Sequence, residues 1–270
     1  MSSNSKKILL IIVGVTIVFT LLFLLRKTEK EKVTIRDFAA IKHSGRLNVV
    51  TDKSSLGFSI SENKIVGFNY DIVKAFADSM GLELNISMQN NLDSSFLGIE
   101  NGTYDLIALN LPTVTPLKSK LAFSTPIYNS RLVLIAKSDS VRNTDKTNYS
   151  FLTKDSISIP FASPHKFRLE NLSNEIANPI KIVEVRGKTS EELAKMVSEG
   201  KIKYTVCDEL QARRLQKIYP NISIETAVGF NQPLAWAVSP NSKELLEQLN
   251  HFLNDFLSSS EYWNIYRRYF

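Results

Sequence analysis

Cysteine and histidine are scarce in this chain of 270 residues, and their scarcity excludes several kinds of site. The single cysteine, Cys207, rules out a disulfide within the chain and leaves the redox compartment open. The preceding residues 204–206 are typical of a buried strand, so a packed thiol is favoured over a reactive one. His43, His165 and His251 lie on separate elements without the spacing of metal ligands. Because zinc motifs, phosphate loops and nucleophile elbows are also missing, we expect no metal, no cofactor and no enzymatic activity.

Most of the chain also lacks an excess of charge of either sign. The formal net charge is +6, but residues 1–32 hold six basic and two acidic side chains, which already give +4. The remaining 238 residues hold 27 basic and 25 acidic side chains. A nearly balanced body argues against a nucleic-acid-binding surface. The basic N-terminal end is typical of residues that flank a membrane segment.

One long apolar run is present, residues 8–25 (ILLIIVGVTIVFTLLFLL), and its eighteen uncharged residues can cross a bilayer. The run continues into LLRK without the small residues of a cleavage site, which favours a retained anchor over a signal peptide. We therefore predict an N-terminus at 1–7, a transmembrane anchor at 8–25 and a charged linker at 26–44. Basic residues on both flanks leave the orientation of the anchor open.

After the linker, strand patterns alternate with helix patterns. The first series predicts strands at 47–50, 82–86 and 105–109 and helices at 69–80 and 93–100. The second predicts strands at 156–161, 182–185 and 203–207 and helices at 164–176, from a capping box at 189–192 to Gly200, and at 209–219. An amphipathic helix at 242–256 and a last helix opened by a capping box at 258–261 follow. This order predicts α/β layers around largely parallel sheets.

Two apolar extended segments, 132–136 and 234–238, suggest that the chain crosses twice between two lobes. We assign residues 45–137 and 229–270 to the first lobe and residues 138–228 to the second. Ligands of open α/β sheets bind at the carboxyl ends of strands, and pockets favour domain interfaces. The sequence therefore predicts a cleft between the lobes.

Several short motifs resemble, in order and spacing, the extracytoplasmic solute-binding proteins of family 3, the type II periplasmic amino-acid-binding proteins. They are GFNYD at 67–71, YDLIA at 104–108, TPLK at 115–118, FSTPIY at 123–128, VCD at 206–208 and YWNIYRRYF at 262–270. Within the family, the Asn-Leu at 110–111 and the Tyr-Phe ending are similar to the non-catalytic domain of membrane-bound lytic murein transglycosylases. The resemblance implies a type II periplasmic-binding-protein fold, with its globular part outside the cytoplasm at a bacterial cell membrane. The catalytic glutamate of such transglycosylases would belong to a helical domain after Phe270.

The resemblance also implies ligand-binding roles for particular residues. Lys118 stands where the family usually has a carboxylate-binding arginine, and Asp208 matches its amine-binding aspartate. Asn110, Leu111 and Thr113 would act with Lys118 from the first lobe, and Ser163 with Asp208 from the second. His165 near the following helix end, and Asp52 and Phe58 in the first lobe, are further candidates.

Each candidate has a plain structural alternative. Lys118 can be a solvated surface lysine, and Asp208 or Ser163 can simply cap the helix that follows it. The hydroxyl of Thr113 can satisfy a local turn, and Phe58 can belong to the core. The chain also departs from the family pattern, because Pro112 is an extra residue and a lysine lacks the planar fork with which arginine holds a carboxylate.

The expected function is closure of two lobes over a small polar ligand, an amino acid or a short cell-wall peptide. A membrane permease or a lytic transglycosylase would be the partner protein. One alternative is a degenerate regulatory or scaffold module of a transglycosylase system, without ligand or catalysis. Another is an enzyme on the same scaffold, for which His165 is the candidate titrating group.

Overall fold

The computed structural model describes residues 34–61, 64–141, 152 and 154–270, and the chain divides into two units, Met1–Thr34 and Ile35–Phe270. The predicted N-terminus, anchor and first part of the linker, residues 1–33, lie outside the described residues. Within the described ranges, none of the helices has the length and apolar character needed to cross a membrane.

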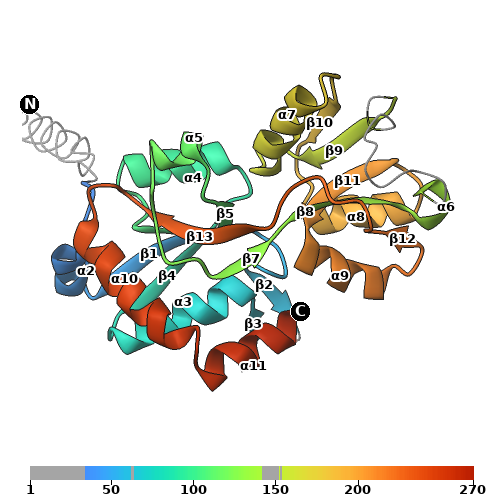
Figure 1. The fold of residues 1–270 in the computed structure, drawn as a ribbon. Helices are drawn as coiled ribbons and strands as arrows, with labels where there is room; N and C mark the ends of the chain where they lie inside the picture. Colours follow the sequence, from blue (N-terminus) through green and yellow to red (C-terminus); the bar gives the residue numbers. More distant parts are fainter. Residues whose placement is uncertain (1–33, 62–63, 142–151, 153) are drawn as a thin grey trace, which may run out of the picture. The chain divides into compact units, whose positions relative to one another are not determined.

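The first lobe of the second unit is built on a mixed sheet (Figure 1). The strand order is β4 (Glu83–Met88), β1 (Arg46–Thr51), β5 (Leu106–Pro112), β13 (Gln232–Val238) and β6 (Ala122–Phe123), with β7 (Tyr128–Ser130) also paired to β13. β1 runs parallel to β4 and β5, whereas β13 is antiparallel to β5. A small hairpin of β2 (Ser59–Ser61) and β3 (Lys64–Val66) lies apart from this sheet.

The second lobe has a sheet of the same kind. Its order is β10 (Lys181–Val185), β9 (Ser156–Pro160), β11 (Tyr204–Asp208), β8 (Leu132–Lys137) and β12 (Ile222–Ser223). β9 is parallel to β10 and β11, while β8 is antiparallel to β11 and β12. The predicted α/β layers with a largely parallel centre are therefore present in both lobes.

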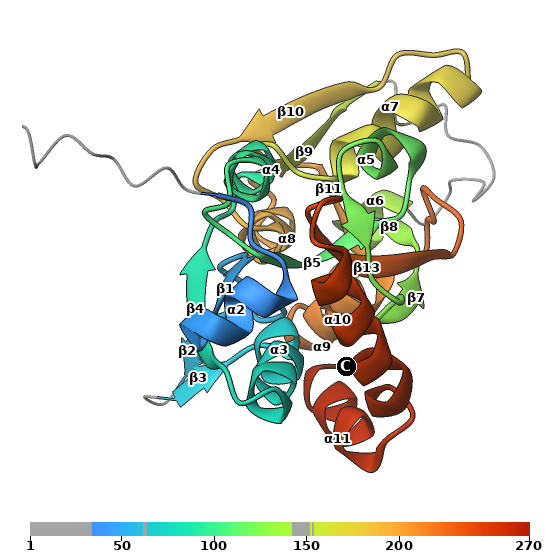
Figure 2. The same cartoon turned by 90° about the vertical axis from the view of Figure 1, so that its left-hand side faces the viewer.

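Helices cover both faces of each sheet. In the first lobe, α2 (Phe38–Ser44), α3 (Phe68–Ser79), α10 (Lys243–Phe256) and α11 (Ser260–Tyr269) share one core with the sheet, and α4 (Leu92–Glu100) packs on the other face. Figure 2 shows α10 running on into α11 on the side of the sheet that carries α3. In the second lobe, α7 (His165–Glu175) covers one face, and α8 (Ser190–Ser198) and α9 (Glu209–Ile218) cover the other. Two short helices, α5 (Thr115–Lys118) and α6 (Ser138–Val141), complete the set in the described residues.

The local sequence explains most of these elements. In α10, Leu245, Leu249 and Leu253 recur every four residues and are fully buried, which gives the helix one apolar face. α8 begins with the predicted capping box, in which Thr189 accepts from the Glu192 N–H and Glu192 accepts from the Thr189 N–H. The box predicted before α11 is displaced by one residue. Ser259 is the cap, because the hydroxyl of Ser258 instead donates to the Asp255 carbonyl at 2.9 Å.

The predicted lobe boundary needs a correction. Residues 132–137 were assigned to the first lobe, but they form β8 inside the second sheet, between β11 and β12. A strand covered on both faces reads as a continuous apolar run, so the apolarity of 132–136 reflects burial in a sheet rather than a crossing. The crossings lie immediately outside the strands, at Arg131 and at residues 229–231.

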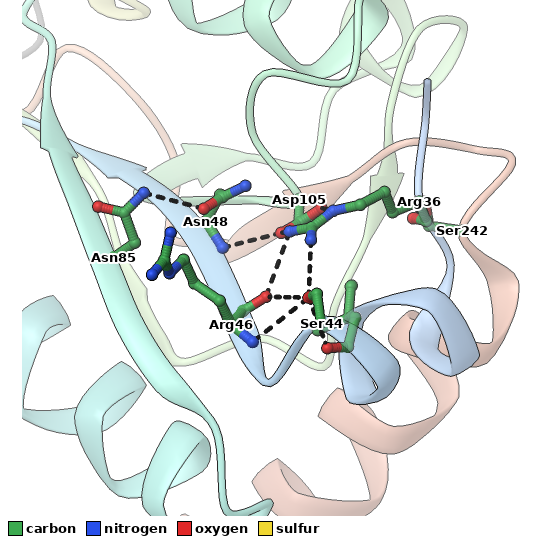
Figure 3. A network of polar contacts seen from close by, with 8 residues as sticks. Arg36, Ser44, Arg46, Asn48, Asn85, Asp105 and Ser242 are labelled. Carbon is green, nitrogen blue, oxygen red and sulfur yellow. Dashed lines mark hydrogen bonds and ion pairs between the residues drawn. The ribbon is translucent and has the colours of Figure 1, made fainter. Parts of the chain in front are cut away.

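The predicted linker also ends too late, because residues 36–44 belong to the first lobe. Asp37 caps α2 and also accepts from the N–H groups of Glu244 and Leu245 at the start of α10, at 3.2 and 2.8 Å. Arg36 forms an ion pair with the buried Asp105, which also accepts from the Asn48 N–H at 2.8 Å (Figure 3). The charges of this segment suggested a solvated linker, but here they satisfy helix ends and a buried carboxylate.

The ion pair between Arg36 and Asp105 predicts a large effect of one substitution. Arg36→Gln leaves a carboxylate whose side chain is 1% exposed without its cation, and the arginine itself is 23% exposed. We expect the free energy of unfolding to fall by about 2–4 kcal/mol, as measured by urea denaturation.

Arg46→Gln is the matched control, since Arg46 pairs with Glu83 through side chains that are 53% and 68% exposed. That variant should lose less than about 1 kcal/mol. Equal losses in the two variants would contradict a structural role for residues 36–44.

Candidate functional site

A cavity of about 180 Å³ lies between the two lobes and is lined by both. One water molecule needs roughly 10–15 Å³ of such space, so the cavity can hold a small organic ligand. Its walls come from the carboxyl ends of β1 and β5 in the first lobe and of β9 and β11 in the second. The predicted cleft at the carboxyl ends of the strands is therefore present.

Asp52 enters the cavity from the first lobe, directly after β1. The chain folds back tightly around it, and the Phe58 N–H donates to the Asp52 carbonyl at 2.9 Å. A Cβ atom at Gly57 would lie 2.0 Å from the Asp52 carboxylate, so this close approach requires glycine. Burial raises the pKa of Asp52, against a hydrogen bond from Ser54 that favours the charged form.

Asp208 enters from the second lobe at the end of β11. It caps α9 by accepting from the N–H groups of Leu210 at 2.9 Å and Gln211 at 3.5 Å. The two alternatives for this residue, cavity residue and helix cap, are thus both realised by one carboxylate. Burial raises the pKa of Asp208 to about 6, although nearby Ser130 and the two N–H groups favour the ionised form.

Ser163 and His165 also line the cavity, at the turn from β9 into α7. Ser163 lies one residue before the N-cap position of α7, because the helix begins at His165 and Pro164 occupies that position. The Ser163 hydroxyl still accepts a hydrogen bond from the first helical N–H, that of His165, at 3.3 Å. The preceding Ala162 has a φ of 52° in the left-handed region, a strained conformation for a residue with a Cβ. Burial lowers the pKa of His165 to about 4, so its imidazole is neutral at pH 7.

The remaining sequence candidates divide into two groups. Asn110 and Leu111 line the cavity at the end of β5, although the Leu111 side chain is fully buried in the core. Phe58, Thr113 and Lys118 do not line it.

The structure shows where each of these three residues lies instead. Phe58 is a buried core residue that packs edge-on against Tyr70 with ring centroids 5.5 Å apart. β5 continues through Pro112, which is paired with Leu234, so the turn that carries the Thr113 hydroxyl begins only after the end of this strand. Lys118 lies at the exposed end of α5 and outside the cavity lining, whereas the sequence predicted that it faces the ligand.

Sequence reasoning missed several lining residues. Gln89 and Asn90 follow β4 at the same sheet edge as Asp52, a position that the strand-end rule already indicates. Tyr128, Ser130 and Arg131 lie on or just after β7, a strand too short to carry a periodic pattern. Their place at the cavity follows from the pairing of β7 with β13.

Three lining side chains carry buried polar atoms without a hydrogen-bond partner in the described structure, namely Asn110 Oδ1, Tyr128 Oη and Ser130 Oγ. Tyr128 and Ser130 are only 8% and 4% exposed. The Ser130 hydroxyl lies close enough to Asp208 to favour its ionised form, yet it makes no hydrogen bond of acceptable geometry. Unsatisfied buried polar atoms are rare and costly, and several around one cavity indicate a missing partner.

The lobes also contact each other directly beside the cavity. Ser55 of the first lobe donates its hydroxyl to Glu191 on α8 and accepts from Arg214 on α9. Elsewhere the Leu92 N–H at the start of α4 donates to the Ala162 carbonyl at 3.3 Å. These contacts join the two lobes directly.

Among the described residues, no group of three or more histidine, cysteine, aspartate or glutamate side chains is placed to hold a metal ion. Cys207 is buried, as its strand pattern predicts, and burial raises the pKa of its thiol.

Residues 47–270 match the profile of bacterial extracellular solute-binding proteins, family 3. The chain belongs to this family. Family 3 membership agrees with the motifs quoted from the sequence, and curated relatives extend the likeness. Membrane-bound lytic murein transglycosylase F of Alcanivorax borkumensis is 30% identical over 212 residues, which cover 77% of this chain and 44% of that protein. The protein of the same name from Desulfosudis oleivorans is 28% identical over 235 residues, which cover 85% and 50%. The chain thus spans about half the length of the curated relatives it matches.

Solved structures share the fold of this family 3 chain. The solute receptor for L-cysteine of Neisseria gonorrhoeae superposes with a TM-score of 0.74 at 16% identity, covering 87% of this chain and 93% of the receptor. The amino acid ABC transporter substrate-binding protein AbpA from Streptococcus pneumoniae, bound to L-arginine, gives 0.71 at 22% identity, covering 86% and 97%. At these identities the likeness establishes the fold of two α/β lobes, as expected from the sequence.

The low pKa of His165 predicts a pH effect on stability. A histidine of pKa about 4 in the folded state, against 6.5 in the unfolded chain, costs stability as the pH falls from 6.5 to 4. His165→Gln removes that loss, so its thermal midpoint should fall less than that of the unchanged protein between pH 7 and pH 4.5.

Asp208→Asn is the opposing variant, because a carboxyl whose pKa is raised from 3.8 to about 6 is stabilising only when protonated. Asparagine keeps the cap, so this variant should be more stable than the unchanged protein at pH 7 and lose that gain by about pH 4. Parallel midpoint curves for all three proteins would show that neither group is buried as described.

The contact of Ser55 with Glu191 and Arg214 predicts an effect on lobe closure. Ser55→Ala removes the hydroxyl but leaves the 3.3 Å ion pair of Arg214 with Glu191 within the second lobe. Hydrogen bonds to charged groups contribute about 1.5–3 kcal/mol, so we expect the closed-to-open equilibrium constant without ligand to fall at least about tenfold. Small-angle X-ray scattering should show a larger radius of gyration. Ser258→Ala should leave it unchanged, because the Ser258 hydroxyl bonds to the Asp255 carbonyl in the last turn of α10, within the first lobe. Identical scattering curves for Ser55→Ala and the unchanged chain would rule out this contact as a determinant of closure.

Proposed function

We propose that this chain is the ligand-binding part of a membrane-anchored, extracytoplasmic solute-binding protein, and that it closes over a small polar ligand. An amino acid or a short cell-wall peptide fits the size and polarity of the cavity. The observation that supports this most is the cavity itself, which both lobes line and into which unsatisfied polar atoms of one lobe and a carboxylate of the other are directed. Family membership and the fold support the same proposal.

The mechanism we propose is a shift of population between open and closed lobes. A ligand that contacts Asn110 or Tyr128 on one side and Asp208 or Ser163 on the other binds the closed state more tightly than the open one. Its polar groups would satisfy the atoms that have no partner in the described structure, and this differential contact is what a ligand needs in order to drive closure.

Anchoring and partners are part of the proposal. Residues 8–25 would hold the globular part at the bacterial membrane, outside the cytoplasm, and the partner would be a permease or a lytic transglycosylase. The transglycosylase is favoured because the curated relatives bear that name and this chain matches about half of their length. We propose no catalytic role for the chain itself, since the pKa of about 4 makes the His165 imidazole a weak base.

Two observations favour a second function, a regulatory or scaffold module that works without a ligand. Lys118 lies outside the cavity, and the lobes are already joined through Ser55. Such a module would keep the closed shape as a fixed surface for its partner protein.

A ligand panel separates the two functions. Thermal unfolding of the full chain in a mild detergent would be followed with neutral, acidic and basic amino acids, short cell-wall peptides and simple amines at millimolar concentration. A ligand at 100 times its Kd stabilises the native state by about 2.7 kcal/mol, which raises the midpoint of a domain of this size by several degrees. A scaffold module would show no shift with any compound.

Two alanine variants test whether the shift arises at the cavity. Asp208→Ala removes a cap worth about 1 kcal/mol and should also abolish the shift. Ser259→Ala removes the cap of α11, far from the cavity lining, and should lower the basal midpoint by a similar amount while keeping the shift. If Asp208→Ala keeps the full shift, the ligand binds elsewhere and the proposal fails.

A further inference from the structure

The two crossings between the lobes form one short ribbon whose strands differ in length. In the first lobe, the end of β7 is paired with the start of β13. In the second lobe, the Val228 N–H donates to the Leu132 carbonyl at 2.9 Å. Between these two paired points one crossing has a single residue, Arg131, and the other has three, 229–231. The longer crossing therefore contains the residues that strand pairing leaves free.

The shorter crossing is fixed to the second lobe by Glu209, the first residue of α9. The Glu209 N–H donates to the Arg131 carbonyl at 2.9 Å, and its carboxylate accepts two hydrogen bonds from the Arg131 guanidinium, at 2.7 and 3.2 Å. The backbone and the side chain of Arg131 are thus both held by one residue. Since this crossing has no slack of its own, the freedom of the hinge depends on the longer crossing.

Arg168 of α7 attaches the longer crossing to the second lobe. Its Nε donates to the Val228 carbonyl at 2.7 Å. Its side chain lies across Gly229, where a Cβ atom would be 3.3 Å from Nε and 3.6 Å from Cδ. Its guanidinium carbon lies 6.0 Å from the centre of the Phe230 ring, at the outer limit of a cation–π contact, and Phe230 is 82% exposed. One side chain therefore contacts three successive residues at the start of this crossing.

Glu175 orients the guanidinium for this contact. The two terminal nitrogens of Arg168 donate to the Glu175 carboxylate at 2.6 and 3.0 Å, a planar two-point contact that leaves Nε for the Val228 carbonyl. Glu175 itself is half exposed, so the ion pair alone contributes little to stability. The side chain of Arg168 is only 19% exposed, and a charged donor contributes more in such a partly desolvated place.

The same arginine also lines the cavity, together with Phe167 and Asn171 of α7. Phe167 packs against the apolar cluster of the first lobe that contains Leu111. The first two turns of α7 thus contact the cavity, the first lobe and the longer crossing. Any movement of α7 away from the first lobe has to be taken up by residues 229–231.

From these contacts we propose that Arg168 is a positioning residue for lobe movement, which ties the start of the longer crossing to α7 and thereby limits how far the lobes separate. Without this tie, all of residues 229–231 are free to adjust when the lobes move. The inference rests on the part of the proposed function in which the lobes open and close, and it does not depend on the identity of the ligand.

The experiment measures the distance between the lobes by double electron–electron resonance on the full chain, in mild detergent and without ligand. Spin labels are attached at Lys120→Cys in the first lobe and Lys181→Cys in the second, two exposed positions, while the fully buried Cys207 stays unlabelled. Arg168→Gln should broaden the distance distribution toward longer separations, by about 1.2–1.5-fold in width. The reason is that the end-to-end distance of a free segment grows with the square root of its length.

Hydrogen exchange at the Val228 amide is the second measurement, followed by mass spectrometry of peptides that span this residue. Opening of this end of the ribbon breaks the bond between Arg168 and the Val228 carbonyl. Loss of that bond should therefore speed the exchange of the Val228 amide by about 10–100-fold.

Two further variants separate the tie from the charge. Glu175→Gln removes the ion pair but leaves Nε of Arg168 bonded to Val228, so it should keep the distance distribution and the exchange rate of the unchanged chain. Arg168→Lys keeps a cation beside Glu175 but lacks the planar fork that bonds to both partners. It should therefore broaden the distribution as Arg168→Gln does.

The inference is overturned by an unchanged distribution or an unchanged Val228 exchange rate in the two Arg168 variants, and equally by the same broadening in Glu175→Gln. If Arg168→Gln does not fold, Arg168→Lys decides, with its cooperative thermal unfolding as proof that it is folded. None of these results bears on ligand binding, because the thermal panel uses the unchanged chain. Conversely, a panel without any shift overturns the binding function and leaves a broadened distribution as support for the tie.

Discussion

Two short crossings, at Arg131 and at residues 229–231, hold the carboxyl ends of two sheets against one cavity, and the site depends on this constraint. β8 enters the second sheet directly after the first crossing, and β13 returns to the first sheet directly after the second. Both strands are antiparallel to a parallel centre, so each crossing is locked at its two ends by strand pairing. Hinge motion at these crossings can change the distance between the lobes, but the carboxyl ends of the two sheets continue to face each other.

Asp208 shows how structural and binding roles are combined in this site. The carboxylate caps α9, and such a cap is partly desolvated because the helix packs against a sheet. Desolvation raises the pKa of Asp208 to about 6, and no ion pair to Asp208 is present among the described residues. A ligand cation beside such a carboxylate would contribute more binding free energy than one beside a carboxylate that is already paired. The same reasoning applies to Asp52, which the chain surrounds by means of Gly57.

The sequence was most informative where a signal is local or where strand order alone determines position. The capping box at Thr189, the leucines of α10 and the aspartates that end β1 and β11 were all readable, and they place Asp52 and Asp208 at one sheet edge each. Motif order gave the family. The sequence was misleading where polar or apolar character had a tertiary cause. Arg36 and Asp37 resembled a solvated linker, and residues 132–136 resembled a crossing.

The sequence by itself determined the α/β order, the family and the strand ends from which a ligand can be reached, because these depend on periodicity and on short motifs. Only the tertiary structure decided which side chains share the cavity. Lys118 lies at the exposed end of α5, outside the cavity lining. Arg131 and Arg168 line the cavity, and Glu209 and Glu175, with which they pair, are separated from them by 78 and 7 residues. Charge compensation is a property of neighbours in space, and hence the sequence could not show which cations of the cavity are paired.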